Sequence, residues 1–573
     1  MQVGIPDGVL LEKAQNTLFD FLIENYSSCN DNSTLFEYYG KVYSLNVFRS
    51  DVMHLAGSLI DLGITEGDTV LICLITTPES IALLYACNLI GAVPVMADVR
   101  LSVSELYSLI CETKVKLAFI SDFHISNPRL LTSPPTLKHL IISSPCDALP
   151  KIVQLTRNLS LSATGKPYIL FRSSKSKICR WSDLFRRKPY SSANIRRSQQ
   201  VNGGELLFTT SGTSGSRKYV RISALSLNLA AYRYCLFMDI SQINTVLSVM
   251  PIFTCYGFLN SVHAPLLFSK KLILYPIYRF RSFPRILLKT RASASFGVLG
   301  QWEALLHDRM CRKADLSFLK YASWGGDGSS DEWVKKMNRF LSEHKCEAKI
   351  MQGYGMTETV STATLQTIND YVIGSSGKAL PYTQVCIVED NGHRLLPAGE
   401  LGEICIHSIC QADGYYHDSL GSSQLIREHS DGKLWIHSGD LGYMDQEGHL
   451  FVIGRKKRMF VLENGTKVFL QNLEALICKD EEIANCAAIT VTDSLRQNTK
   501  RIVLFIVPKA GISINRLKKR ISASVRNSLP DYLHPDRIVF ARRIPKNSLG
   551  KTDYPELTAI WEAHDSEISN MNA

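Results

Sequence analysis

The sequence has little that would mark a secreted, disulfide-bonded or metal-binding protein. Its 15 cysteines are scattered singly from Cys29 to Cys486, with no CxxC pair and no two histidines at metal-ligand spacing. We therefore predict reduced, mostly buried thiols. Asp7 and Glu12 come before any apolar stretch and no basic leader precedes them, so we expect no secretory signal and a cytoplasmic location.

The sequence also lacks an unbroken apolar run of membrane-spanning length. The least charged stretch, residues 80–97, is interrupted by Asn88, Gly91 and Pro94, whereas a membrane helix needs about 18 or more apolar residues in succession. A buried helix that runs into a short buried strand at residues 93–96 explains this stretch better. We therefore predict no transmembrane segment.

A strong charge of one sign is missing as well. The 64 Lys and Arg residues and 53 Asp and Glu residues give a net charge of +11 over 573 positions, which suits a phosphate-bearing small ligand as well as nucleic acid. The basic clusters at 455–458 and 516–520 have no aromatic residues spaced as a base-stacking platform. We interpret both clusters as solvated faces and expect no nucleic-acid partner.

The residues that are present indicate a folded, enzyme-sized α/β protein. At roughly 100–200 residues per folding unit, the chain makes about three or four domain-sized pieces, and its 45% hydrophobic and 20% charged residues are typical of globular proteins. Apolar runs at 69–75, 117–121 and 271–275 alternate with amphipathic helical stretches, the pattern of a parallel sheet covered by helices. Residues 143–202, rich in Ser, Lys and Arg, are predicted to be an irregular surface excursion.

The pattern changes beyond residue 370. Short strands are predicted at 384–389, 402–407 and 449–453, followed by a tail with helices at 471–478 and 513–529 and a strand at 501–507. We predict an α/β fold class with a large N-terminal domain of stacked α/β sheets at 1–457. This domain includes a β-rich subdomain at about 370–457, and a small α+β C-terminal domain follows at 458–573.

The most informative segment joins an apolar strand to small hydroxyl and glycine residues and ends in lysine. Glycines let backbone N–H groups converge on an anion, hydroxyls add donors and lysine adds a point charge. The segment is not a Walker A loop, in which Gly-Lys is followed directly by Ser or Thr, and its alternative interpretation is a flexible linker. The residues of this predicted phosphate loop are Thr210, Ser211, Gly212, Thr213, Ser214, Gly215 and Lys218.

Three further segments carry chemistry that suits a nucleotide. Residues 352–359 bring Tyr354, which can stack on a base, close to Glu358, which can bind a hard cation. Asp440 directly follows a glycine, which suits a grip on two ribose hydroxyls, although a simple turn is the alternative. Lys551 follows a glycine turn and is either a solvated lysine or one that reaches a distant site.

In this order and spacing, the segments resemble the adenylate-forming superfamily of acyl-CoA synthetases, nonribosomal adenylation domains and luciferases. The predicted phosphate loop is similar to the TSGTTGxPK signature of that family, residues 354–359 to YGxTE, and residues 399–404 to GExGEI. Residues 438–440, 454–457 and 545–551 resemble the remaining signatures. The likeness therefore spans nearly the whole chain.

The resemblance implies ATP and Mg²⁺ as cofactors. It implies that the phosphate loop holds the β- and γ-phosphates, that Thr357 contacts the α-phosphate and that Glu358 coordinates Mg²⁺. The catalytic residues implied in this way are Lys218, Thr357, Glu358 and Lys551. The residues implied to bind the nucleoside are Gly325, Gly326, Asp327 and Tyr354 for the adenine and Asp440 and Arg455 for the ribose.

The implied reaction is attack of a carboxylate on the α-phosphorus of ATP, with release of pyrophosphate and formation of an acyl-adenylate. Lys551 is implied to bridge the carboxylate and the α-phosphate, and positioning with charge neutralisation suffices without a nucleophilic side chain. In the family a mobile C-terminal domain then rotates, and a thiol attacks the acyl carbon. The resemblance implies Arg458 as the hinge and Gly465 as a residue of the thiol channel.

The absence of one acidic residue narrows the class of acid that we expect as substrate. Amino-acid-activating relatives carry an aspartate near the segment that corresponds to residues 251–257, and none is present there. We therefore expect a hydrophobic small-molecule acid that is fatty, aryl or polyketide-like. The residues predicted to line its pocket are Phe253, Thr254, Tyr256, Trp302 and Trp324, and the alternative for each aromatic is a plain core position.

Five positions depart from the family signatures. Arg217, Tyr219, Thr254, Arg458 and Leu470 stand where the family has proline, glycine, histidine, aspartate and proline. The change at Thr254 bears on the gate of the acid pocket. The change at Arg458 bears on the second half-reaction more than on the first, since the residues implied for adenylation are retained.

Three functions follow in order of preference. The first is an AMP-forming acid–thiol ligase, similar to acyl-CoA synthetases, with coenzyme A as the thiol. The second is a stand-alone adenylation enzyme that loads the phosphopantetheine of a separate carrier protein, since the 22 residues after Lys551 are too few for a fused carrier domain. The third is a nucleotide-binding pseudoenzyme, which would have no need for Glu358 together with Lys551.

Overall fold

The computed structural model divides the chain into two compact units. The larger comprises residues 1–386, 405–438 and 444–451, and the smaller comprises 387–404, 439–443 and 452–573. The domain boundary predicted after residue 457 stays a prediction. The residues that the structure describes are 8–26, 31–122, 131–150, 153, 178–184, 195, 197–211, 217–326, 329–389, 392, 394–461, 467–492, 500–546 and 552–571.

A seven-stranded sheet forms one layer of the larger unit. Its strand β3 (Thr69–Cys73) is buried at every position, as is typical of parallel strands covered on both faces. Helix α4 (Pro78–Leu89) then returns the chain to the parallel strand β4 (Val93–Met96), so the predicted buried helix and strand are confirmed. The sheet order is β7 (Ile178–Arg180), β6 (His139–Ser143), β5 (Leu117–Ser121), β3, β4, β8 (Glu205–Ser211) and β9 (Arg217–Ser223).

One part of the predicted irregular excursion is regular. Strand β7 extends the seven-stranded sheet by pairing in parallel with β6, and helix α7 (Trp181–Leu184) buries Trp181 and Leu184. The prediction of an irregular surface segment was wrong for these residues. A strand of three residues is too short to show an alternating pattern, so the sequence carried no signal for it.

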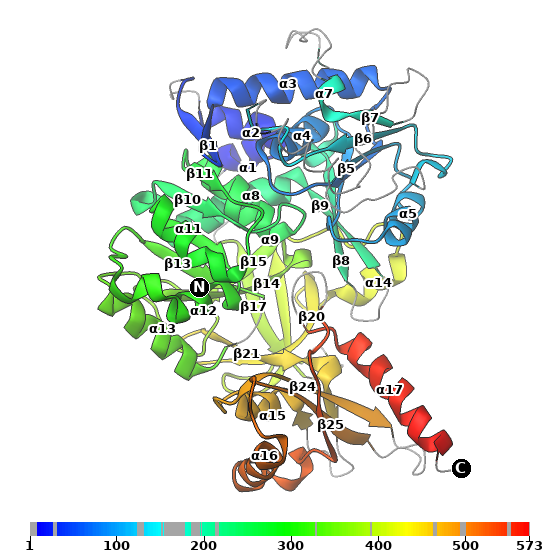
Figure 1. Ribbon diagram of the computed structural model, residues 1–573. Helices are drawn as coiled ribbons and strands as arrows, with labels where there is room; N and C mark the ends of the chain where they lie inside the picture. The colour runs from blue at the N-terminus through cyan, green and yellow to red at the C-terminus, as the bar shows by residue number, and fades with distance from the viewer. Residues whose placement is uncertain are drawn as a thin grey trace. The chain divides into compact units, whose positions relative to one another are not determined.

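A nine-stranded sheet forms the second layer of the larger unit (Figure 1). Helices α11 (Phe283–Thr290), α12 (Leu299–His307) and α13 (Asp331–Glu343) connect its successive strands. The central strands are parallel, whereas β14 and β15 are antiparallel. The sheet order is β16 (Lys378–Ala379), β15 (Ser361–Leu365), β14 (Ile350–Met356), β13 (Tyr321–Trp324), β12 (Ala294–Gly297), β10 (Thr245–Ser248), β11 (Lys271–Leu274), β1 (Thr34–Tyr38) and β2 (Lys41–Ser44).

A five-stranded sheet follows in the chain. Three of its strands match the predicted short strands beyond residue 370. The order is β17 (Thr383–Val388), β18 (Gly402–Ser408), β20 (Leu434–Met444) and β19 (Ile426–Glu428), with β21 (Leu450–Arg455) also paired with β20. The other α-helices of the larger unit among the described residues are α1 (Gly8–Ala14), α2 (Leu18–Glu24), α3 (Leu45–Asp61), α5 (Val103–Glu112), α8 (Ala224–Met238), α9 (Cys255–Phe258), α10 (Ala264–Leu267) and α14 (Ser419–Leu425).

The smaller unit is built on a three-stranded sheet of β24 (Ile483–Thr492), β25 (Lys500–Pro508) and β26 (Arg537–Phe540). One face packs against α15 (Leu470–Ile477) and α16 (Ile514–Ser528), which confirms the predicted tail helices. The other face, with Ala487, Val503 and Phe505, packs against α17 (Tyr554–Met571). Successive β25 residues therefore enter opposite cores, as the two-residue period of a strand requires. The hairpin of β22 (Met459–Val461) and β23 (Lys467–Phe469) precedes this sheet.

The α/β fold class is confirmed, with a large N-terminal sheet domain and a smaller C-terminal domain. Within the described part of the chain, no helix is both long and apolar enough to cross a membrane.

Candidate active site

The predicted phosphate loop joins the strands of the β8–β9 hairpin. The strands are antiparallel, with Thr210 directly opposite Lys218 and Ser211 opposite Arg217. Opposed residues point to the same face of a sheet, so the hairpin brings a hydroxyl and an ammonium together. Residues 212–216 lie outside the described part of the chain, and the roles of Gly212, Thr213, Ser214 and Gly215 stay predictions.

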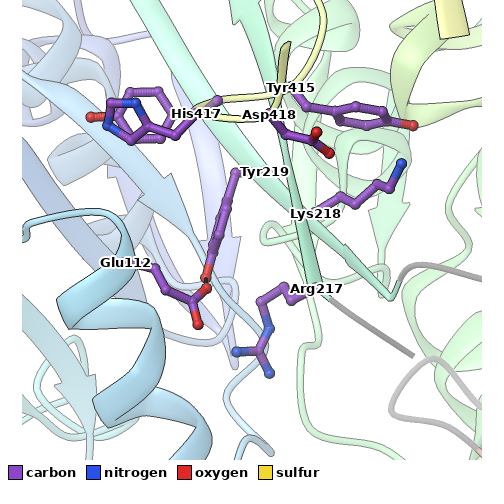
Figure 2. Close-up of a pocket in the computed structure, with 8 residues that line it drawn as sticks. Glu112, Arg217, Lys218, Tyr219, Tyr415, His417 and Asp418 are labelled. Carbon is purple, nitrogen blue, oxygen red and sulfur yellow. Dashed lines mark hydrogen bonds between the residues drawn. The ribbon is translucent and has the colours of Figure 1, made fainter. Parts of the chain in front are cut away.

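Both departures from the family loop signature are paired with carboxylates of α5. Arg217 Nη2 lies 3.2 Å from Glu105 Oε1, and the Tyr219 hydroxyl donates to Glu112. Burial, together with Glu112, raises the pKa of Tyr219, so the hydroxyl keeps its proton and remains a donor. Figure 2 shows the Tyr219 side chain directed toward Glu112. These two substitutions therefore fasten β9 to α5 and leave Lys218 between them.

Tyr415 links Lys218 to the predicted metal ligand. The Lys218 ammonium lies 4.0 Å from the centre of the Tyr415 ring, and the Tyr415 hydroxyl donates to Glu358 Oε1 at 2.8 Å (Figure 2 shows the lysine and the tyrosine). A cation over an aromatic ring and a hydrogen bond to a carboxylate are both favourable contacts. One side chain thus positions a cation and a buried carboxylate relative to each other.

Sequence reasoning missed Tyr415. The residue reaches the site through an isolated bridge to Val220 of β9 and a backbone hydrogen bond from Ala412 to Glu358. Lys218 is almost 200 positions from Tyr415 in the chain, and Glu358 is almost 60 positions from it. No local pattern signals contacts of that range.

A pocket opens beside these residues and has a volume of about 250 Å³. Small-molecule sites are typically roughly 300–1,000 Å³, so the volume of this pocket lies slightly below that range. Its lining combines cations, two carboxylates and hydroxyls, which suits a charged ligand group. The lining residues are Glu112, Arg217, Lys218, Tyr219, Tyr415, Tyr416, His417 and Asp418.

Glu358 also fits the Mg²⁺ that the family implies. Mg²⁺ prefers hard oxygen ligands and is usually held by one or two carboxylates together with substrate phosphates. Glu358 supplies such a carboxylate and is oriented by Tyr415. Thr357 begins the short 3-10 helix Thr357–Thr359, so the hydroxyl of a half-buried threonine lies directly before this carboxylate in the chain.

The residues predicted to surround adenine lie on two neighbouring parallel strands, with Gly325 directly after β13 and Tyr354 within β14. Trp324 of β13 pairs with Gln352 of β14, so Gly325 and Tyr354 extend from the same edge of the sheet. A Cβ atom at Gly325 would lie 3.8 Å from the Gly353 carbonyl oxygen, which shows how close the two segments are. Gly326 has a φ of +93°, a conformation that favours glycine. Asp327 lies outside the described residues.

Gly355 fixes the course of the chain after Tyr354. The pairing of β14 with β15 shifts register between these two residues. A Cβ atom at Gly355 would lie 1.8 Å from the Ser361 carbonyl oxygen, a distance that no side chain can adopt. Glycine is therefore required there, and this close approach places the half-buried Tyr354 at the strand edge.

The predicted pocket residues divide into two groups. Tyr256 is half-buried, and its ring lies 3.9 Å from the position of a Cβ atom at Gly325. Thr254 caps α9 by accepting a hydrogen bond from the Gly257 N–H, so the residue in the usual histidine position begins a helix. Phe253, Trp302 and Trp324 are buried in the core. The Trp302 indole donates to the Ser323 carbonyl, and this placement favours the alternative of a core position for the two tryptophans.

The predicted ribose site lies in the smaller unit. Arg455 Nε donates to Asp440 Oδ1 at 2.8 Å, and the Asp440 side chain is buried. Glu403, from the segment similar to GExGEI, accepts the Gly439 N–H at 3.1 Å and lies 3.5 Å from Lys456 Nζ. Glu403 therefore fastens the backbone before Asp440 to the residue after Arg455. The GExGEI-like signature alone does not indicate these contacts of Glu403, because Gly439 and Lys456 are distant in the chain.

The predicted hinge residue is tied to the C-terminal elements of the same unit. Arg458 Nη2 donates to Glu474 Oε1 at 2.6 Å, and its guanidinium lies 3.7 Å from the centre of the Tyr554 ring. The Tyr554 hydroxyl donates to the same carboxylate at 3.2 Å. These contacts connect Arg458 to α15 and to the start of α17. Gly465 and Lys551 lie outside the described residues, and their roles stay predictions.

Comparison with known proteins places the chain in a family. The model of the AMP-binding enzyme family matches residues 27–416, and the model of the AMP-binding enzyme C-terminal domain matches residues 472–551. The chain therefore belongs to the AMP-binding enzymes, the ATP-using adenylate-forming enzymes. The predicted family and the prediction of an enzyme are both confirmed.

Among the curated relatives, the chain is 23% identical to the long-chain-fatty-acid–CoA ligase of Bacillus subtilis strain 168, over 91% of this chain and 90% of the relative. It is 24% identical to the indoleacetate–CoA ligase of Aromatoleum aromaticum, over 87% of this chain and 89% of that protein.

Solved structures share the fold. The anthranilate CoA ligase AuaEII in complex with anthranoyl-AMP has a TM-score of 0.79 at 18% identity, with 96% of this chain and 98% of that chain covered. ATP-bound MatB from Rhodopseudomonas palustris has a TM-score of 0.76 at 19% identity, with 95% and 98% covered.

Proposed function

We propose that the protein activates a hydrophobic carboxylic acid with ATP and then transfers the acyl group to the thiol of coenzyme A. The observation that carries this proposal is the arrangement of Lys218, Tyr415 and Glu358, in which one tyrosine positions both a cation and a carboxylate suited to Mg²⁺. A protein that only bound nucleotide would have no use for this pair. The Asp440–Arg455 pair of the smaller unit suits the vicinal hydroxyls of ribose.

In the first half-reaction, the carboxylate of the acid attacks the α-phosphorus of ATP. The bond from that phosphorus to the oxygen of the leaving pyrophosphate breaks, and the acyl-adenylate remains. Two anions must approach each other, so cations and hydrogen-bond donors provide most of the stabilisation. Lys218 and Thr210 hold the leaving phosphates in this proposal, and Lys551 contacts the α-phosphate. Mg²⁺ bound at Glu358 would neutralise phosphate charge.

In the second half-reaction, the thiol attacks the acyl carbon and AMP leaves with its phosphate. The C-terminal domain carries Lys551 away from the acyl-adenylate by rotation about Arg458, and Gly465 lies beside the incoming thiol. The ion pair of Arg458 with Glu474 supports a hinge that moves together with the C-terminal elements.

Two observations support a hydrophobic acid. Residues 251–257 contain no aspartate that could pair with a substrate ammonium, and Tyr256 presents an aromatic surface beside Gly325. The printed names of the relatives describe ligases of long-chain fatty acids and of indoleacetate. Fatty and aryl acids are therefore the substrates to test first.

The experiment is pyrophosphate release with ATP and Mg²⁺ over a panel of fatty, aryl and amino acids, with and without coenzyme A. We expect turnover with a fatty or aryl acid that rises strongly with coenzyme A and yields acyl-CoA. Lys551→Ala should abolish adenylate formation, whereas Lys546→Ala, which removes an exposed lysine of the same segment, should not.

Other outcomes would redirect the proposal. Pyrophosphate release that is unaffected by coenzyme A would indicate a separate carrier protein as the acceptor. A panel in which no acid supports pyrophosphate release would contradict the proposed activity.

A further inference from the structure

Three metal-binding side chains converge in the five-stranded sheet, outside the residues that the proposed reaction uses. Cys405 lies on β18 and His437 on β20, while His429 directly follows β19 and closes the turn to β20 through a hydrogen bond from its N–H to the Lys433 carbonyl. Strand β20 lies between β18 and β19 in the sheet. The three side chains therefore come from two neighbouring strands and the turn that joins β19 to β20.

The distances within this cluster are short. Cys405 Sγ lies 3.5 Å from His437 Nδ1, and His429 Nε2 lies 3.0 Å from His437 Nε2. One ligand atom from each residue can be chosen so that all three lie within 4.8 Å of one another. Bonds of about 2.3 Å to sulfur and about 2.0–2.1 Å to nitrogen in a tetrahedral zinc site separate the ligand atoms by roughly 3.3–3.6 Å. The cluster is thus close to the size that one ion requires.

The cluster is buried and held in place by its surroundings. Cys405 is fully buried, and His429 and His437 are 8% and 6% exposed. The Trp435 ring stacks on His429 with ring centres 5.3 Å apart. Preformed, buried donors lose little freedom when an ion binds, so such a site needs little rearrangement. One ion can bind only one nitrogen of the His437 ring, whose two short contacts use opposite nitrogen atoms.

The donor set selects the kind of ion. One thiolate with two imidazoles is a soft set that suits Zn²⁺ and disfavours Mg²⁺ and Ca²⁺, which prefer oxygen. Three protein ligands leave the fourth tetrahedral position for water. No local motif indicates such a site, because His429 lies 24 positions after Cys405 and His437 lies 8 positions after His429, which matches no zinc-motif spacing.

We propose that Cys405, His429 and His437 bind one Zn²⁺ ion that fastens β18 to the β19–β20 hairpin. Binding replaces the proton of the Cys405 thiol and joins three strands by metal bonds. This proposal does not depend on the proposed ligase activity.

The test uses the full chain, stripped of metal by a chelator, with Zn²⁺ and Co²⁺ as the probes. We expect one zinc ion per chain, a melting temperature that rises with added Zn²⁺, and a thiolate-to-cobalt charge-transfer band with Co²⁺. Cys405→Ser should remove the band, and His429→Gln should weaken binding by more than the roughly 10–100-fold cost of losing an outer-shell partner. Cys386→Ser, which changes a cysteine of the neighbouring strand β17, should leave all three readouts unchanged.

Two results would overturn the proposal. In the first, the wild-type protein binds neither ion and gives no cobalt band. The three side chains would then be linked by hydrogen bonds and would form no metal site. Equal zinc binding by the wild type and by folded Cys405→Ser would show that the ion binds elsewhere. Because the wild-type cobalt spectrum needs no variant, the test stands even if a variant does not fold.

Discussion

Tyr415 is the residue on which the geometry of the candidate site depends most. Its hydroxyl donates to Glu358 and its ring supports Lys218. Tyr415→Phe keeps the ring and removes the donor, so Glu358 loses a hydrogen bond worth about 1.5–3 kcal/mol. We expect kcat/KM for adenylate formation to fall roughly tenfold to hundredfold, with a higher Mg²⁺ requirement. Pyrophosphate-exchange kinetics at varied Mg²⁺ measure both effects.

The matched control is Tyr371→Phe. The Lys349 ammonium lies 4.7 Å from the centre of the Tyr371 ring, and the Tyr371 hydroxyl donates to the Ile350 carbonyl. It lies outside the candidate site, so its loss should leave the Mg²⁺ requirement unchanged. Equal effects of the two substitutions would contradict the role assigned to Tyr415.

Glu79 gives a prediction about the pH dependence of stability. Burial, with Asp147 and Asp51 nearby, raises the pKa of Glu79 from 4.5 to about 7. Between these two pKa values the folded state therefore binds more protons than the unfolded state. The contribution of Glu79 to the free energy of unfolding is complete below the lower pKa and is lost as the pH rises through about 7. Glu79→Gln stays neutral, so its gain in melting temperature over the wild type should be larger at about pH 8 than at about pH 5.

Thermal unfolding at the two pH values tests this prediction. Glu12→Gln, at an exposed position, is the control and should give no pH-dependent gain. A gain for Glu79→Gln that is the same at both pH values would contradict the assignment.

Some residues of the site were predictable and others were not, for physical reasons. Asp440 and Arg455 were predictable because each stands in a local signature. In the structure they form an ion pair. Tyr415 and Glu403 act through partners that are distant in the chain, and only the folded structure shows those contacts. Trp302 and Trp324 could not be assigned from sequence, because a core position and a pocket wall require the same residue type.

At the scale of elements, the contacts of Arg458 with α15 and α17 lead to a prediction about stability. Glu474 accepts hydrogen bonds from Arg458, from Tyr554 and from the Ala488 N–H at 2.7 Å. Arg458→Met leaves this partly buried carboxylate without its cation. We expect the smaller unit to lose about 1–3 kcal/mol of stability, and denaturant unfolding measures the loss.

Lys518→Met is the control for that prediction, because Lys518 is exposed on α16 of the same unit. It removes the same charge and should change stability by less than about 0.5 kcal/mol. A stability of Arg458→Met equal to that of Lys518→Met would show that the ion pair with Glu474 contributes nothing.

Elements with a strong local pattern were predicted well. β3, α4, β25 and α16 appear within a few residues of their expected positions, because burial dictates their apolar periods. β7 was missed, because three residues show no period. The pairing of Thr210 opposite Lys218 could not be predicted from the sequence either, because strand register depends on how the strands meet in three dimensions.

At the scale of the whole molecule, the order of the signatures was enough to predict the family and the fold class. Solved structures at 18% and 19% identity share the fold with TM-scores of 0.79 and 0.76. The acid was not predictable to the same degree, because it depends on the shape of a pocket to which many residues contribute. Fold alone does not determine a substrate.

The most direct test of the central claim follows the oxygen atoms of the acid. The carboxylate of the best substrate is labelled with heavy oxygen, and the products are analysed by mass spectrometry after complete conversion with ATP and coenzyme A. Attack on the α-phosphorus followed by thiol attack on the acyl carbon leaves one labelled oxygen in AMP and one in acyl-CoA. We expect this result, with no label in pyrophosphate. Label in inorganic phosphate, or AMP without label, would contradict it.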